Sequence, residues 1–266
     1  MRRPKWILFD YGETLVHEED RGLEAGFEAV LKMAVENPRG ATAVDALEIS
    51  ADFYKEILHC AREHGIETYR PNVQRLIFET LGVRFGVSYE VLDDIFWDAA
   101  HPGTVTPGMP EFLDFLKNED IPTGVVSNLS FSGASLRRRL DSLFPSNGFR
   151  FVIATSEYAV RKPAPAIFRL ALSKTGALPE SVWYVGDNAH ADVSGAASVS
   201  MVPVWYRSGL KCTYRNARAD ATPEVEHIHV TDIMQLAEGI RGAYAGTPGA
   251  DVGTPGAPPP GPRARD

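Results

Sequence analysis

The stretch Lys5-Trp6-Ile7-Leu8-Phe9-Asp10-Tyr11-Gly12-Glu13-Thr14-Leu15 decides how the rest of the chain is interpreted. Its apolar residues Trp6 to Phe9 run without interruption between charged neighbours, a pattern typical of a strand buried on both faces of a parallel sheet. Such a strand presents Asp10 at its carboxyl end, where open parallel sheets bind ligands. Aspartate also ends many buried strands because it forms turns, so this stretch alone does not assign a function.

Strand-like and helical patterns alternate from Pro107 onward, as expected of a parallel α/β sheet. Further strands are predicted at residues 122–128, 149–154, 182–187 and 201–205, with helices beginning at Pro107, near Ser135 and at Ala166. The predicted fold class is therefore α/β, with a Rossmann-like parallel sheet as its core.

The segment between Leu15 and Thr104 shows helical periodicity instead, which predicts a compact helical insertion. Two sets of residues recur at helical spacing: Phe53, Ile57, Cys60 and His64, and Leu92, Ile95, Phe96 and Ala99. Breaks are expected at residues 38–40 and 82–86. We expect His64 to be a partly buried packing residue and His17 to be a solvated linker residue.

The domain boundaries follow from these patterns. Residues 1–15 and 105–241 are expected to form the discontinuous α/β core, and residues 16–104 the helical domain. Residues 242–266 contain a repeated Gly-Thr-Pro-Gly-Ala motif and a proline run. Because this composition buries too little apolar surface to offset the entropy of ordering, a disordered tail is expected there.

Composition limits the partners and the compartment. The 266 residues include 44% hydrophobic and 23% charged residues, with a formal net charge of −8, which argues against a nucleic-acid partner. Cys60 and Cys212 are too far apart in sequence to suggest a metal-ligand pair or a disulfide framework. The basic start is followed by an apolar run that Asp10 and Glu13 interrupt, so neither a signal peptide nor a membrane span is predicted. A cytoplasmic protein is expected.

Several polar residues stand at predicted strand or loop ends, and in a right-handed parallel sheet these ends share one edge. They are Asp10 with Thr14, Ser127 with Asn128, Lys162, and Asp187 with Asp192. A carboxylate pair suits Mg²⁺, which prefers oxygen ligands, while a hydroxyl and a lysine suit an anion. The Asp10 carboxylate could then attack phosphorus, with the cations cancelling the repulsion between two anions.

With these residues in place, the sequence resembles the haloacid dehalogenase-like superfamily. The matching motifs occur in the family's order: residues 9–15, Val126-Ser127-Asn128, Arg161-Lys162-Pro163 and Gly186-Asp187-Asn188-Ala189-His190-Ala191-Asp192, with Val105-Thr106-Pro107-Gly108 marking the return to the core. The resemblance covers about residues 5–240 and implies that the insertion is a helical cap. It also implies an enzyme that hydrolyses a small phosphorylated metabolite.

The resemblance implies a role for each matched position. Asp10 would be the nucleophile that forms an aspartyl-phosphate. Asp187 would bind Mg²⁺, with Asp192 in or next to the coordination shell and Asp10 and the main-chain carbonyl of Gly12 as further ligands. The alternative for Asp187 and Asp192 is a turn followed by a helix N-cap.

The remaining matched residues would contact the substrate. Lys162 would be the cation that steadies the nucleophile and the phosphate, and Ser127 the phosphate-binding hydroxyl. Thr14 and Asn128, beside the nucleophile and Ser127, are also expected to bind the substrate.

One position departs from the family pattern. Phosphatases of this family usually carry a second aspartate two residues after the nucleophile, where this chain has Gly12. A positioned acid–base group contributes about 10²–10⁴-fold to a rate, so activity limited to good leaving groups is expected. Glu13 could substitute for the missing acid, and the alternative is a solvent-facing loop residue.

Two rival functions remain open from the sequence. Metal-independent 2-haloacid dehalogenases of the family also lack the second aspartate, although Asp187 and Asp192 would be surplus in such a site and would repel a haloacid's carboxylate. A binding protein on a non-catalytic fold is the other rival, against which the presence of Asp10, Lys162 and Asp187 counts.

Overall fold

The core of the molecule is a six-stranded parallel sheet. The computed structural model describes residues 3–210 and 221–245. The strand order is β10-β9-β8-β1-β6-β7, and every neighbouring pair is parallel. The strands are β1 (Trp6–Phe9), β6 (Thr123–Ser127), β7 (Val152–Ala154), β8 (Val182–Gly186), β9 (Val202–Tyr206) and β10 (Ile228–Val230). The predicted α/β class is confirmed.

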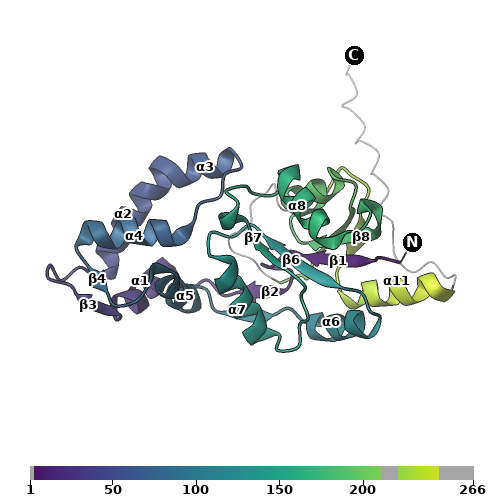
Figure 1. Cartoon of the computed structure of the whole chain (residues 1–266), viewed down its shortest axis with the longest axis horizontal. Coiled ribbons are helices and arrows are strands. Elements are labelled where there is room, and N and C mark those ends of the chain that lie inside the picture. The colour runs from purple at the N-terminus through teal and green to yellow at the C-terminus, as the bar shows by residue number, and fades with distance from the viewer. Residues whose placement is uncertain (1–2, 211–220, 246–266) are drawn as a thin grey trace, which may run out of the picture.

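Helices cover both faces of the sheet (Figure 1), which explains the uninterrupted apolar run of β1. Successive strand side chains point to opposite faces. Ile7 and Phe9 belong to one apolar cluster with the helices α6, α7 and α11, whereas Leu8 belongs to a second cluster with α8. The core helices are α6 (Met109–Asn118), α7 (Gly133–Leu143), α8 (Pro165–Thr175), α9 (Gly195–Ala197) and α11 (Met234–Ala245).

Some elements of the core differ from the predicted ones. The sixth strand, β10, was not predicted, and β7 begins at Val152 rather than at residue 149. Helix α11 continues to Ala245 and so includes residues 242–245, which the sequence predicts to belong to the tail. Residues 246–266 and Cys212 lie outside the described residues.

The insertion forms a helical lobe beyond the carboxyl ends of the strands (Figure 1). Its helical elements are α1 (Leu23–Leu31), α2 (Ala43–Phe53), the π-helical turn η1 (Tyr54–Leu58), α3 (His59–Glu63), α4 (Arg70–Leu81) and α5 (Tyr89–Ala100). It also contains strands that were not predicted: β2 (Val16–Glu18) pairs antiparallel with β5 (Gly103–Val105), and β3 (Ala34–Glu36) pairs with β4 (Arg84–Phe85). The chain leaves the core through β2 and returns to it through β5, so the β2–β5 ribbon connects the lobe to the core.

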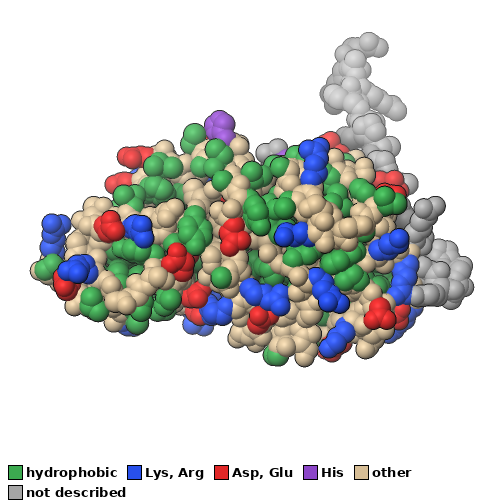
Figure 2. Space-filling model, viewed as in Figure 1, with side chains coloured by type: hydrophobic (Ala, Val, Ile, Leu, Met, Phe, Trp, Pro, Cys, Tyr) green, Lys and Arg blue, Asp and Glu red, His purple; other side chains and the backbone are tan. Residues whose placement is uncertain are grey.

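Of the two sets of residues that recur at helical spacing, only the one on α5 lies in the apolar core. Leu92 and Phe96 on α5 are fully buried. Ile57 is 47% exposed, and Cys60 and His64 are exposed as well, so the expectation that His64 is a packing residue was wrong. Hydrophobic side chains are visible on the surface of the lobe (Figure 2).

Candidate active site

The sheet brings the predicted strand ends together at one edge. β1 lies between β6 and β8, with Phe9 opposite Val125 and Val185. The Asp10 amide extends this ladder by donating to the Val185 carbonyl at 2.9 Å. Asp10, Ser127 and Asp187 therefore leave three adjacent parallel strands on the same side.

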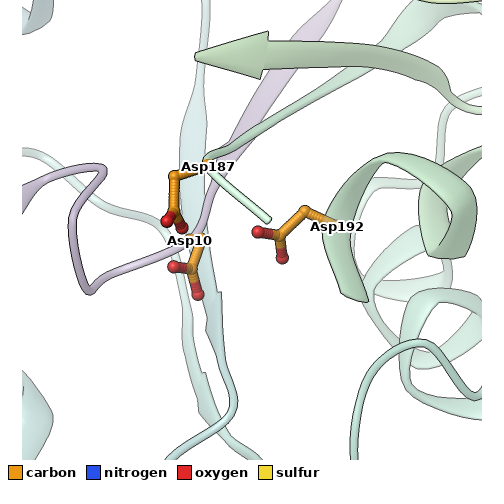
Figure 3. A group of neighbouring side chains, drawn as sticks. All are labelled: Asp10, Asp187 and Asp192. Atoms are coloured by element: carbon orange, nitrogen blue, oxygen red, sulfur yellow. The ribbon is translucent and has the colours of Figure 1, made fainter. Parts of the chain in front are cut away.

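Three carboxylates from separate elements converge at this edge. Ligand oxygens of Asp10, Asp187 and Asp192 all lie within 4.8 Å of one another, and all three residues are buried. Figure 3 shows the three side chains gathered around a common space. The donor set is all oxygen and carries excess negative charge, so these residues fit a hard divalent cation such as Mg²⁺.

Gly186 allows Asp192 to approach this cluster. Asp192 lies on the π-helical turn η4 (Ala189–Ser194), which follows β8 closely. A Cβ atom added at Gly186 would stand 2.4 Å from the Asp192 Cγ. A side chain at this position would therefore displace the third carboxylate.

Lys162 is the buried cation of the site, and only 4% of its surface is exposed. Its Nζ donates to Asp10 Oδ1 at 2.6 Å, to Asp192 Oδ1 at 2.6 Å and to the Tyr184 hydroxyl at 2.9 Å. Burial disfavours the charged ammonium, but the two carboxylates outweigh burial and raise the pKa of Lys162 well above its usual value. The lysine is thus a fixed positive charge against the predicted nucleophile.

The electrostatics of Asp10 reflect both burial and its neighbours. Burial raises the pKa of Asp10 to about 6, although Lys162 lowers it and Asp192 adds a smaller increase. A carboxylate that is buried, held by one lysine and still ionised near neutral pH has the properties required of a nucleophile.

Asn188 and Asp192 both form hydrogen bonds at the start of η4. The Asn188 side chain accepts hydrogen bonds from the His190 and Ala191 amides, so the N-cap is Asn188 rather than either aspartate. Asp192 Oδ2 accepts from the Asn188 amide at 3.0 Å while its Oδ1 holds Lys162. Both Asp192 oxygens therefore accept hydrogen bonds from the protein, and each oxygen keeps a further lone pair that could face a metal ion.

The predicted substrate-binding residues differ in their surroundings. Ser127 is buried at the end of β6, close to the acidic edge. Asn128 clamps the lysine loop instead: its Oδ1 accepts from the Lys162 amide at 2.7 Å, and its Nδ2 donates to the Lys162 carbonyl at 3.0 Å. The Thr14 hydroxyl is buried and has no hydrogen-bond partner within the described part of the chain.

The turn after Asp10 is tight. The Tyr11 carbonyl accepts from the amides of Leu15 and Val16, and the Glu13 amide donates to Val16. These main-chain bonds do not use the Gly12 carbonyl, which is the predicted metal ligand. Across residues 3–210 and 221–245, no other main-chain bond outside helices and strands uses it either.

Glu13 is not a solvent-facing loop residue, which was the alternative to an acid role in the sequence analysis. It is 1% exposed, and its Oε2 lies 2.9 Å from the Nδ1 of His17. His17 lies on β2, and its side chain is only 28% exposed, so the expectation of a solvated linker residue was also wrong.

Sequence reasoning missed Tyr184 in the site. Its hydroxyl accepts from Lys162 and donates to the Val126 carbonyl at 2.8 Å. The only signal in the sequence is a phenol in an otherwise apolar buried strand, because a buried tyrosine hydroxyl usually has a hydrogen-bond partner.

Three strand-end motifs and the buried lysine of the loop at residues 161–163 thus meet at one acidic edge of the sheet. Residues 4–200 match the family model of the haloacid dehalogenase-like hydrolases. The chain belongs to this family and is an enzyme of the hydrolase class.

Comparisons with individual proteins agree with this assignment. The chain is 36% identical over 230 residues to a glyceraldehyde 3-phosphate phosphatase of Methanopyrus kandleri, covering 84% of this chain and 92% of the relative. It is 28% identical over 247 residues to the Pyrococcus furiosus enzyme of the same name, covering 90% and 93%. A 2-haloacid dehalogenase from Pseudomonas syringae pv. Tomato has the same fold, with a TM-score of 0.59 and 21% identity over 91% of this chain and 99% of that one.

No helix among residues 3–210 and 221–245 is long and apolar enough to cross a membrane.

Proposed function

We propose that the enzyme hydrolyses small phosphate monoesters through an aspartyl-phosphate on Asp10. The observation that carries this proposal is the Lys162 ammonium, which holds Asp10 Oδ1 at 2.6 Å within a cluster of three buried carboxylates. The phosphatase names of the relatives at 28% and 36% identity support the same reaction class.

The reaction takes two steps. An Asp10 carboxylate oxygen forms a bond to phosphorus, the bond from phosphorus to the ester oxygen breaks, and the leaving alkoxide takes up a proton from solvent. Water then attacks the same phosphorus and releases a proton to solvent, the bond to Asp10 breaks, and inorganic phosphate leaves with the carboxylate restored. Lys162 reduces the repulsion between the nucleophile and the phosphate in both steps.

A divalent cation is the second part of the proposal. Asp10, Asp187 and the Gly12 carbonyl would hold Mg²⁺, and Asp192 would lie next to it and keep Lys162 in place. When bound, the ion would supply positive charge against the transferring phosphoryl group. The Ser127 hydroxyl is proposed to bind a phosphate oxygen, and Thr14 and Asn128 are proposed to support the substrate site.

Gly12 restricts the proposed chemistry. Without a carboxylate at this position, the leaving oxygen has no acid immediately beside the nucleophile to protonate it. We propose that esters with good leaving groups, such as aryl and acyl phosphates, react much faster than alkyl phosphates. Residues 16–104 would act as the cap that selects the substrate. The cytoplasmic location and the absence of nucleic-acid and membrane partners stay predictions.

The test is phosphate release from p-nitrophenyl phosphate, acetyl phosphate, glyceraldehyde 3-phosphate and phosphoserine, each with Mg²⁺ and with a chelator. We expect Mg²⁺-dependent turnover that Asp10→Asn lowers by about 10³-fold or more. Equal turnover by the wild type and Asp10→Asn would refute the nucleophile. Halide release from a 2-haloacid in chelator, without phosphate release from any ester, would establish the dehalogenase rival instead.

A further inference from the structure

The insertion touches the catalytic edge through a short segment, residues 65–70, which leads into α4. The Gly65 carbonyl accepts from the Arg161 amide at 2.9 Å, and the Arg70 amide donates to the Ser130 carbonyl at 2.9 Å. One end of the segment is therefore tied to the loop that carries Lys162. Its other end is tied to the loop that follows Ser127 and Asn128.

Glu67 lies in the middle of this segment and points into the core. Its side chain is completely buried and forms an ion pair with the Arg161 guanidinium. The Thr155 hydroxyl donates to Glu67 Oε2 at 3.2 Å and accepts from the Leu129 amide at 3.1 Å. Because a buried charge is costly unless it is paired and hydrogen-bonded, these partners define one position for the segment.

Both partners of Glu67 lead to the same lysine. Arg161 directly precedes Lys162 in the chain. Leu129, which Thr155 holds, directly follows Asn128, and the Asn128 side chain grips the Lys162 amide and carbonyl at 2.7 and 3.0 Å. A carboxylate of the insertion is thus connected to the main chain of Lys162 by two separate routes.

We propose that Glu67 is a positioning residue for the catalytic lysine, so that docking of the insertion and placement of the Lys162 ammonium are one event. The lysine side chain is long and flexible, and its contact with Asp10 depends on a fixed main chain. A misplacement of about 1 Å at a reacting group costs about 10²-fold in rate. This role rests on the proposed function, because it concerns the same lysine and nucleophile.

The experiment separates positioning from simple stabilisation. Glu67→Gln and Arg161→Met each leave one member of the pair unmatched, and both should lower kcat/KM by about 10- to 100-fold and reduce stability. The double variant Glu67→Leu/Arg161→Met leaves no unpaired charge, so its urea midpoint should return to near the wild-type value. Its kcat should stay low, because the connection to Lys162 is lost.

Amide hydrogen exchange gives a readout that needs no activity. The Arg161 amide is bonded to Gly65 and the Lys162 amide to Asn128, and both should exchange at least about tenfold faster in the double variant than in the wild type. A double variant that regains full activity together with its stability, or that keeps wild-type exchange at residues 161 and 162, would overturn the proposal.

Arg138→Met is the matched control. Arg138 on α7 forms another ion pair between core and insertion, with its Nε 2.9 Å from Asp94 Oδ2 on α5. It should leave kcat/KM within about twofold of wild type and exchange at Lys162 unchanged. Faster exchange in the Glu67 variants of an enzyme that releases no phosphate would support the coupling and overturn only the proposed function.

Discussion

At the scale of single residues, Glu13 is the most unusual position near the nucleophile. It adopts φ 58°, in the left-handed region, and it is buried against His17. This backbone conformation costs a residue other than glycine roughly 1–2 kcal/mol of conformational free energy. Such strain persists where the surrounding structure imposes it, which is common at functional sites. We therefore regard Glu13 as the candidate for the general acid that is missing at position 12.

Glu13→Gln tests this role with little change in shape. We expect turnover of an alkyl phosphate to fall about tenfold or more, whereas p-nitrophenyl phosphate should change by less than about threefold, because its leaving group needs no proton. Steady-state kinetics with both esters gives the comparison. A parallel loss on both substrates would show that Glu13 only supports the turn.

Some residues of the site could be predicted because they interrupt a pattern. Asp10 and Asp187 end uninterrupted apolar runs, so their placement at one sheet edge follows from the parallel topology. Tyr184 carries no such signal, because a tyrosine within a buried strand is as consistent with packing as with a hydrogen bond to Lys162. Glu67 and Arg161 are 94 residues apart, and nothing in their local sequence indicates that they pair.

At the scale of secondary-structure elements, a strand could be predicted where it belongs to a longer stretch of apolar residues. The strands β1 and β8 are four or five largely apolar residues, and the three-residue strand β7 lies in the mostly apolar stretch of residues 149–154. The strands β2, β5 and β10 also contain three residues each, but no longer apolar stretch surrounds them. β2 and β5 form only by pairing with each other across the whole insertion.

Asp93 on helix α5 makes the free energy of unfolding depend on pH. Asp93 is fully buried, and burial raises its pKa to about 7 although Arg70 Nε lies 3.0 Å from its Oδ1. The pKa in the folded state is above the ordinary value of 3.8, so the folded protein retains a proton that the unfolded chain has released. This contribution is complete below pH 4 and is lost as the pH rises towards 7.

Asp93→Asn should therefore flatten the pH dependence of unfolding. Between pH 4.5 and 7 we expect the wild type to lose up to about 1.4 kcal/mol per pH unit relative to the variant. Urea unfolding at several pH values measures the difference. Asp52→Asn, at an exposed carboxylate on α2, is the control and should keep the wild-type slope. A variant whose slope equals that of the wild type would assign the effect to other groups.

At the scale of the whole molecule, the fold concentrates negative charge at the point where its elements meet. Asp10 follows β1, Asp187 follows β8 and Asp192 lies on η4, and Lys162 forms ion pairs with Asp10 and Asp192. Folding therefore brings three carboxylates together that repel one another. A bound cation would relieve this repulsion and couple metal binding to global stability.

Mg²⁺ should stabilise the folded protein by mass action, by about 2.7 kcal/mol at a concentration one hundred times Kd. For a protein of this size that corresponds to a rise in Tm of about 5–10 °C, which thermal unfolding with Mg²⁺ and with a chelator would detect. Asp187→Asn removes one repelling charge and one ligand, so it should raise Tm in chelator while abolishing the response to Mg²⁺. Asp114→Asn, at an exposed carboxylate of α6, should respond as the wild type does. An Asp187→Asn variant that kept the full response would place the stabilising ion elsewhere.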